Sequence, residues 1–171
     1  VLRPEELDAF LAGAGAAWAG WLKASGFEAA LGDTRLLPGG DGQVAAAVVG
    51  LGKPQARRRQ RFGLARAVAV LPAGNWQLSG ALSPDEATEA ALAFLLAGYR
   101  FDRYRPGRKP AELPLLQCPA GLDPARLIAM AEGEVLTRDL INTPAQDMGP
   151  GELEAAVRDL ASRHGATVSA V

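Results

Sequence analysis

The chain has 171 residues, of which 49% are apolar, and a formal net charge of −1 at pH 7. A chain of this length can bury roughly 70% of its unfolded surface, so a hydrophobic core is expected. The composition excludes a disordered chain and a generally cationic nucleic-acid binder. A single cysteine, Cys118, excludes an internal disulfide, and no apolar run is long enough to span a membrane. The start also lacks a signal-peptide pattern, so we expect a cytoplasmic protein with no membrane partner.

The first forty residues predict two short helices and two short strands. Helical patterns cover residues 4–11 and 14–24. Trp18 and Trp21 lie on one side of the second pattern, which makes them expected core residues. The strands are expected at residues 27–30 and 34–38, before a glycine-rich reversal at 39–42.

A nearly continuous apolar run follows at residues 43–51. A run of strand length between turn residues is typical of a strand covered on both faces, so the domain is predicted to be α/β. The sequence Gly50-Leu51-Gly52-Lys53 follows it directly. A phosphate loop would need glycine at position 47 and serine or threonine at position 54, where this chain has Ala47 and Pro54. A dinucleotide fingerprint would need glycine at position 55, where this chain has Gln55. The spacing therefore argues against nucleotide binding.

Five arginines cluster in the next segment, which is predicted to be helical as far as residue 70. They are Arg57, Arg58, Arg59, Arg61 and Arg66. Phe62, Ala65 and Ala69 can share one buried face, which favours a solvated basic surface. The alternative is a nucleic-acid contact, because a basic stripe neutralises phosphates whatever the net charge of the chain.

A strand is predicted at residues 76–78, and Ser83-Pro84-Asp85-Glu86 then forms a capping box that begins a helix ending near Gly98. The basic and aromatic sequence of residues 99–105 follows, and then a strand at 113–118.

Two helical patterns occupy the last third of the chain. The first begins at Asp123-Pro124 and continues to Leu140, and the second ends at Gly165. Pro144 and Pro150 exclude helix between them, so the chain is expected to cross from one unit to another over residues 142–149. Residues 166–171 alternate like a strand that needs neighbours. The first residue, Val1, is not methionine. These two features together lead us to expect a longer parent polypeptide.

Three motifs in order resemble the leucyl aminopeptidases, also called cytosol aminopeptidases, and the resemblance covers about residues 43–165. The motifs are Gly50-Leu51-Gly52-Lys53, Tyr99-Arg100-Phe101-Asp102-Arg103-Tyr104, and Arg138-Asp139-Leu140-Ile141-Asn142-Thr143-Pro144 followed by Met148-Gly149-Pro150. The last is similar to the family's connector between its amino-terminal and catalytic domains. The resemblance therefore makes Arg138, Asp139, Asn142, Thr143 and Pro144 a structural connector motif.

The resemblance implies a three-layer α/β/α amino-terminal domain with a mixed sheet at residues 1–121. A connector helix and hinge would occupy 122–150, and residues 151–171 would be the first helix and strand of a second α/β domain. The family releases amino-terminal residues from peptides with two divalent metal ions, Zn or Mn, in the catalytic domain, and assembles as hexamers. The expected partners are therefore the chain's own catalytic domain, other copies of the protein and, for the parent, peptide substrates.

The family's catalytic signatures do not occur in residues 1–171. One histidine and one cysteine cannot form a usual zinc site, and His164 is expected to be a polar residue in a last helical turn. We therefore expect no catalytic, metal or substrate-binding residue in this chain, which would be inactive alone and would support assembly and access to the active site. The alternative is a stand-alone α/β binding or assembly module that contacts nucleic acid through its arginine cluster.

Overall fold

The computed structural model describes residues 1–105, 107, 109 and 112–169. Its elements, in chain order, are η1 (Pro4–Glu6), α1 (Leu7–Gly13), α2 (Ala16–Ala24), β1 (Thr34–Pro38), β2 (Val44–Val49), α3 (Pro54–Arg59), α4 (Ala65–Val68), β3 (Gly74–Trp76), α5 (Pro84–Ala97), β4 (Pro114–Leu116), α6 (Pro124–Asn142) and α7 (Pro150–His164).

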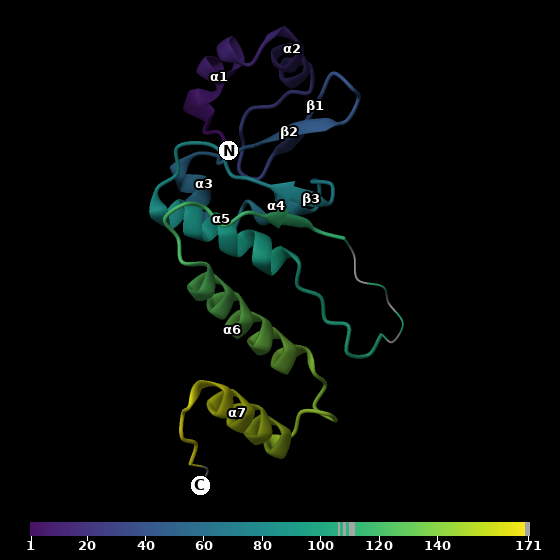
Figure 1. Cartoon of the computed structure of the whole chain (residues 1–171), viewed down its shortest axis with the longest axis vertical. Helices are drawn as coiled ribbons and strands as arrows, with labels where there is room; N and C mark the ends of the chain where they lie inside the picture. Colours follow the sequence, from purple (N-terminus) through teal and green to yellow (C-terminus); the bar gives the residue numbers. More distant parts are fainter. Residues whose placement is uncertain (106, 108, 110–111, 170–171) are drawn as a thin grey trace.

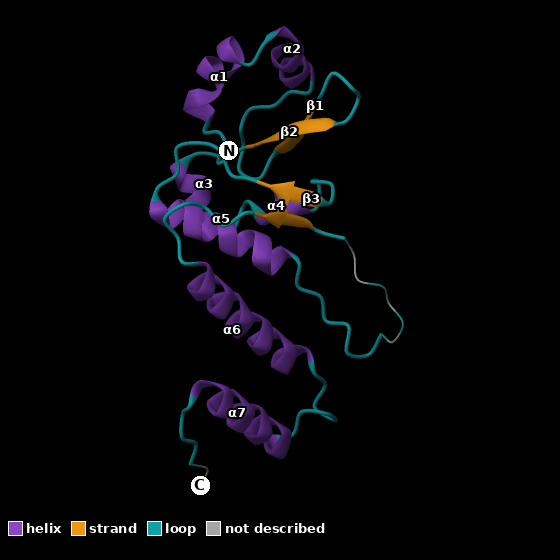
Figure 2. Cartoon of the chain, viewed as in Figure 1, coloured by secondary structure: helices purple, strands orange, loops and turns teal. Residues whose placement is uncertain are grey.

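The strands form two small sheets. β1 and β2 pair antiparallel, with Thr34 opposite Val49, and β3 and β4 pair parallel, with Gly74 opposite Pro114. The amino terminus lies between the sheets (Figure 2) and connects them: Leu2 forms a parallel bridge with Gly50, and the Val1 amino group donates to the Ser79 carbonyl. The predicted mixed α/β class is confirmed, with its sheet divided into two pairs.

Strand β2 is covered by helices on both faces, as its apolar run predicts. Val48 packs into a cluster with Leu22 of α2 and Leu37 of β1, whereas Val49 packs into a cluster with Ala67 of α4 and Ala90 of α5. Successive residues of a strand point to opposite faces, so each of these valines belongs to a different core.

Helix α5 begins where the sequence predicts. The Ser83 hydroxyl accepts a hydrogen bond from the Glu86 N–H at 3.2 Å, and the Glu86 carboxylate accepts one from the Ser83 N–H at 2.9 Å. Pro84 occupies the first turn. This capping box fixes the start of the helix on which α6 packs.

A third cluster attaches α6 to the rest of the molecule. It joins Ala91 and Leu92 of α5 to Leu127 and Ala131 of α6. Figure 1 shows α6 leading away from α5, with α7 beyond it at the end of the molecule opposite α1 and α2. The two predicted helices of the last third are both present, and residues 143–149 between them are not helical.

Four local predictions are wrong. Residues 60–64 interrupt the helix predicted to reach residue 70, because Phe62 has a positive φ of 58° and Gly63 packs against Leu31. Residues 27–30 form no strand, and Ala29 has a φ of 54°. Trp21 is 50% exposed, with its indole N–H donating to the Leu36 carbonyl at 3.1 Å, whereas Trp18 packs on the core. Residues 166–169 do not form the predicted terminal strand, and residues 170–171 lie outside the described residues.

Candidate functional site

The strongest polar cluster joins the segment after α5 to the end of α6. The Tyr99 hydroxyl donates to the Asp139 carboxylate at 2.8 Å and accepts from the Asn142 side-chain amide at 3.0 Å. The Arg138 guanidinium lies 5.4 Å from the centre of the Tyr99 ring, within the range of a cation–π interaction. One tyrosine therefore contacts three residues of the last turns of α6.

A second set of contacts fixes the point where α6 ends. Thr143 is buried, its hydroxyl donates to the Asp139 carbonyl at 2.7 Å, and it accepts from Arg103 at 3.3 Å. The Tyr104 hydroxyl bonds to the carboxylate of Asp147 in the following turn. Residues 99–104 thus contact both the last turns of α6 and the start of the linker to α7. We call residues 99–104 together with residues 138–147 the joint.

The surroundings of both tyrosines in the joint raise their pKa values above the ordinary one. Loss of contact with water, and then the hydrogen bond to Asp139, raise the pKa of Tyr99 above 10.0. The hydrogen bond to Asp147, and then loss of water, raise the pKa of Tyr104 in the same direction. A neutral phenol is a donor, as these two bonds require.

A cavity of about 510 Å³ lies beside the joint, between residues 100–103, α6 and α7. Leu136, Leu140 and Met148 give it apolar walls, and Asp159 brings a carboxylate from α7. The described contacts around this cavity hold the end of α6 and the linker in place.

Four of the five predicted connector residues contact residues 99–104: Arg138, Asp139, Asn142 and Thr143. The fifth, Pro144, begins the next turn, in which its carbonyl accepts from the Asp147 N–H at 2.9 Å. The sequence had indicated residues 99–104 as a motif but not as the partner of the connector. Asp147 was missed, and only its position three residues after Pro144 could have indicated a turn.

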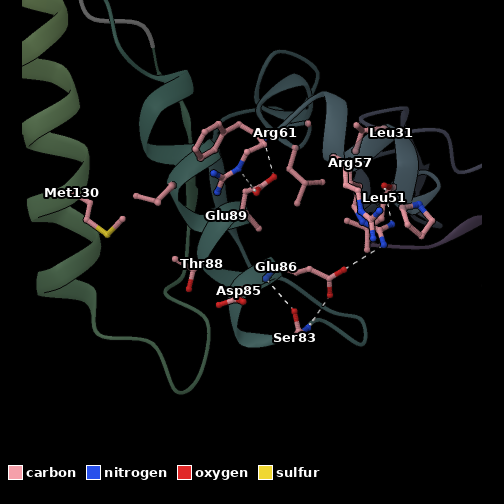
Figure 3. Close-up of a pocket in the computed structure, with 17 residues that line it drawn as sticks. Leu31, Leu51, Arg57, Arg61, Ser83, Asp85, Glu86, Thr88, Glu89 and Met130 are labelled. Carbon is pink, nitrogen blue, oxygen red and sulfur yellow. Dashed lines mark hydrogen bonds and ion pairs between the residues drawn. The ribbon is translucent and has the colours of Figure 1, made fainter.

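The five arginines do not form one free basic surface. Arg57 donates to the Gly52 carbonyl at 2.6 Å and lies 3.7 Å from the Glu86 carboxylate, and Arg61 pairs with Glu89 at 3.2 Å. Figure 3 shows these pairs around a cavity of about 980 Å³ between α3 and α5. Arg66 donates to the Gln60 side chain at 3.0 Å. Arg58 and Arg59 are exposed and make no hydrogen bond or ion pair within the described part of the chain.

No group of three or more His, Cys, Asp or Glu side chains among the described residues could hold a metal ion. The described residues therefore do not fit a two-metal centre. No helix in residues 1–105 or 112–169 is both long and apolar enough to cross a membrane.

Comparison with known proteins identifies the class first. A probable cytosol aminopeptidase of Chelativorans sp. strain BNC1 is 32% identical over 148 residues, which cover 74% of this chain and 29% of that protein. The family model described as "M17 aminopeptidase, N-terminal domain" matches residues 1–116. The chain belongs to the M17 aminopeptidase family, which confirms the resemblance to leucyl aminopeptidases.

Solved structures agree with this assignment. The cytosol aminopeptidase of Coxiella burnetii has a TM-score of 0.76 and 33% identity, over 95% of this chain and 34% of that chain. The bottromycin maturation enzyme BotP, in a complex with Mn, has a TM-score of 0.67 and 30% identity, over 88% of this chain and 35% of that chain. The chain thus spans about a third of the length of the relatives it matches.

Proposed function

We propose that this chain is the non-catalytic amino-terminal region of a metal-dependent leucyl aminopeptidase, which releases amino-terminal residues from peptides. Its role is to support assembly and to control access to the active site. The joint is the observation that supports this role. Tyr99, Arg103 and Tyr104 hold the end of α6 and the linker after it through side-chain hydrogen bonds, so the direction in which α7 leaves is fixed by the amino-terminal domain.

The proposal divides the chain at the joint. Residues 1–121 form the amino-terminal α/β domain, residues 122–150 the connector helix and hinge, and residues 151–171 the first part of the catalytic domain. Two divalent ions, Zn or Mn, are assigned to the catalytic domain and not to these residues. A hexamer in the cytoplasm is proposed from the family, and Mn in the BotP complex supports the choice of metal.

Activity assays test the proposal with the chain and its parent side by side. The 171-residue chain, supplied with Mn²⁺ or Zn²⁺, should not hydrolyse leucine amides, because a metal-activated water needs several fixed ligands. The product of the complete reading frame should hydrolyse them. A reading frame that stops at Val171 would overturn the enzyme assignment, as would metal-dependent turnover that co-purifies with the short chain through several columns.

The second candidate is a stand-alone module that contacts nucleic acid through Arg58 and Arg59, the two arginines of the cluster that are exposed and have no partner among the described residues. Each lysine or arginine that neutralises a phosphate adds about 0.9 to the salt slope of binding to duplex DNA. The variant Arg58→Glu, Arg59→Glu should therefore leave any weak DNA binding and its salt slope unchanged if this surface is only solvated. A slope lower by about two in the variant would favour the module.

A further inference from the structure

The cavity of about 980 Å³ between α3 and α5 has a described lining that includes no residue of the joint (Figure 3). Its volume falls within the roughly 300–1,000 Å³ of small-molecule sites. Separate parts of the chain meet there: the segment 51–64, α5, Leu31 from the loop before β1, and Met130 of α6. A hollow formed between several elements of fixed position is a usual place for a small ligand.

The charges that line the cavity are balanced and separated. Guanidinium groups come from α3 and the turn after it, and carboxylates come from α5. The charged side chains are Arg57, Arg58 and Arg61 on the first wall and Asp85, Glu86 and Glu89 on the second. The described lining therefore carries three charges of each sign. A ligand with a carboxylate at one end and an ammonium at the other complements both walls, whereas a ligand with one charge is opposed by one of them.

One charge on each wall is available to a ligand. Arg58 and Asp85 are exposed and make no hydrogen bond or ion pair within the described part of the chain. Arg57 is partly available, because its Nη2 atom lies 3.7 Å from the Glu86 carboxylate, a distance longer than a hydrogen bond. The available cations and the available anion lie on opposite walls, so a ligand must separate its two charges to reach both.

This separation favours a peptide over a free amino acid. A free amino acid carries its ammonium and its carboxylate on one carbon atom. In an extended peptide each residue adds roughly 3.3–3.6 Å between the two ends. A peptide of a few residues can therefore direct its ends to opposite walls of the cavity, and it fills about 980 Å³ better than a single amino acid does.

The rest of the lining suits apolar side chains. Leu64 and Leu92 are buried and belong to two of the core clusters, so they form a well-packed part of the wall. Met130 lines the cavity from α6 and is 47% exposed. Methionine is flexible and adapts to irregular apolar surfaces, which suits contact with different side chains.

The turn after α3 has an unusual conformation beside the cavity. Phe62 has a φ of 58°, its N–H donates to the Glu89 carboxylate at 2.9 Å, and the Arg61 guanidinium lies 5.4 Å from the centre of its ring. Non-glycine residues in this region of φ cost energy, and they cluster at ligand-binding sites, where surrounding contacts maintain them. These contacts keep the arginine wall opposite α5.

We propose that this cavity is a binding site for a short zwitterionic peptide with apolar side chains. The carboxylate of the peptide faces Arg57 and Arg58, its ammonium faces Asp85, and its side chains contact Leu92 and Met130. The site does not depend on the proposed function, which supplies only a source of such peptides.

Peptides that lack one charge test the proposal on the 171-residue chain. Leu-Ala-Leu is compared with its carboxyl-terminal amide and its amino-terminal acetyl derivative at about pH 7, by NMR of the amides at residues 57–64 and 85–92. EDTA prevents metal-dependent hydrolysis, so the result is independent of the enzyme assignment. Leu-Ala-Leu should bind with a Kd of about 1 mM or lower, and each derivative should bind about threefold more weakly or worse.

Single substitutions assign each end of the peptide to its wall. Arg58→Gln should lower the preference for the free carboxylate over the amide, and Asp85→Asn should lower the preference for the free ammonium over the acetyl form. Arg59→Gln is the matched control, since Arg59 is exposed on the same helix but lines a different cavity. It should keep both preferences. Because the peptides are compared within one protein, a change in its stability cancels.

The wild-type chain alone can overturn the proposal. Equal binding of the three peptides, or unchanged amide signals at about 10 mM Leu-Ala-Leu, would do so without reference to any variant. Tighter binding of free leucine than of Leu-Ala-Leu would assign the cavity to an amino acid and would also overturn it. So would equal effects of Arg58→Gln and Arg59→Gln on the preference for the free carboxylate.

Discussion

The hydroxyl of Tyr99 and the carboxylate of Asp139 meet at 2.8 Å, across 40 residues of sequence. The bond fixes the end of α6 to the segment that leaves α5, at a position where cluster contacts between Leu92 and Leu127 have already brought the two helices together. Apolar packing places α6, and the hydroxyl sets where its last turns lie. The joint therefore depends on specific polar contacts more than the cores do.

Replacing Tyr99 with phenylalanine tests this dependence. The change Tyr99→Phe keeps the ring but removes the partner of Asp139 and Asn142, so the free energy of unfolding should fall by about 1–2 kcal/mol. Hydrogen exchange at residues 138–143 should become faster than at residues 125–131 of the same helix. Tyr104→Phe is the matched control, and because Tyr104 is 47% exposed its loss should be smaller. Equal losses of stability in the two variants would contradict the special role of the Tyr99 hydroxyl in the joint.

Much of the fold follows from local chemistry that the sequence displays. Three local patterns predict elements that the structure contains. The capping residues of α5 satisfy backbone hydrogen bonds, and the prolines on either side of residues 145–149 forbid them. The apolar run of β2 predicts a strand that is buried on both faces. The break at Phe62 was not predictable in this way. Its N–H is bound by the Glu89 carboxylate at 2.9 Å, a partner 27 residues away.

The joint was only half predictable for the same reason. The sequence shows two motifs, but nothing within Tyr99–Tyr104 indicates that its side chains bond to Asp139 and Thr143. That information lies in the packing of α5 on α6. Similarly, the five arginines form a stripe in the sequence, whereas Arg57 and Arg61 are directed by acidic residues of α5 that no local pattern reveals.

Gly50 is predicted to tolerate no side chain. A Cβ atom at this position would lie 2.1 Å from the Ala30 carbonyl oxygen and 2.4 Å from the Ala29 carbonyl carbon, both backbone atoms. Gly50→Ala should therefore lower the free energy of unfolding by about 3 kcal/mol or more. Gly133→Ala in α6 is the control, since a Cβ there meets nothing within 4 Å and should stabilise the helix by about 0.5–1 kcal/mol. Urea denaturation of both variants measures these changes in stability. Similar midpoints for the two variants would show that the backbone of residues 29–30 does not lie close to Gly50.

The capping carboxylate of α5 should make stability depend on pH in the acidic range. The Ser83 backbone N–H, and then Arg3, hold the pKa of Glu86 below its usual 4.5. The folded state therefore releases this proton more easily than the unfolded chain. Its stabilising effect is complete above pH 4.5 and is lost as the pH falls below that value.

The measurement is the urea midpoint of the wild-type chain and of Glu86→Gln at several values between about pH 6 and pH 3. Glutamine cannot ionise, so the stability difference between the two proteins should shrink as the pH falls. Other carboxylates titrate in both proteins and cancel in the difference. A difference that stays constant down to the acid end would show that Glu86 titrates normally.

The apolar face of α7 is the last feature with a testable consequence. Leu153, Val157 and Leu160 are 48%, 43% and 37% exposed, so the amino-terminal domain does not cover them. Full burial of such a side chain stabilises by about 1.5–3 kcal/mol, more than helix caps recover. We therefore expect this face to pair with a second copy of the chain, because symmetric dimers are the commonest way to cover a self-complementary patch.

Light scattering of the chain beside Leu153→Asp, Leu160→Asp should show a dimer that becomes a monomer. The control is Arg158→Asp, which makes the same change in net charge and breaks only the exposed pair with Glu154. The control should remain a dimer. The expectation would be contradicted by a wild-type chain that stays monomeric at high micromolar concentration while α7 is protected from hydrogen exchange. An isolated helix of this length is not stable without an apolar surface to pack against. In a monomer that surface could only be the amino-terminal domain.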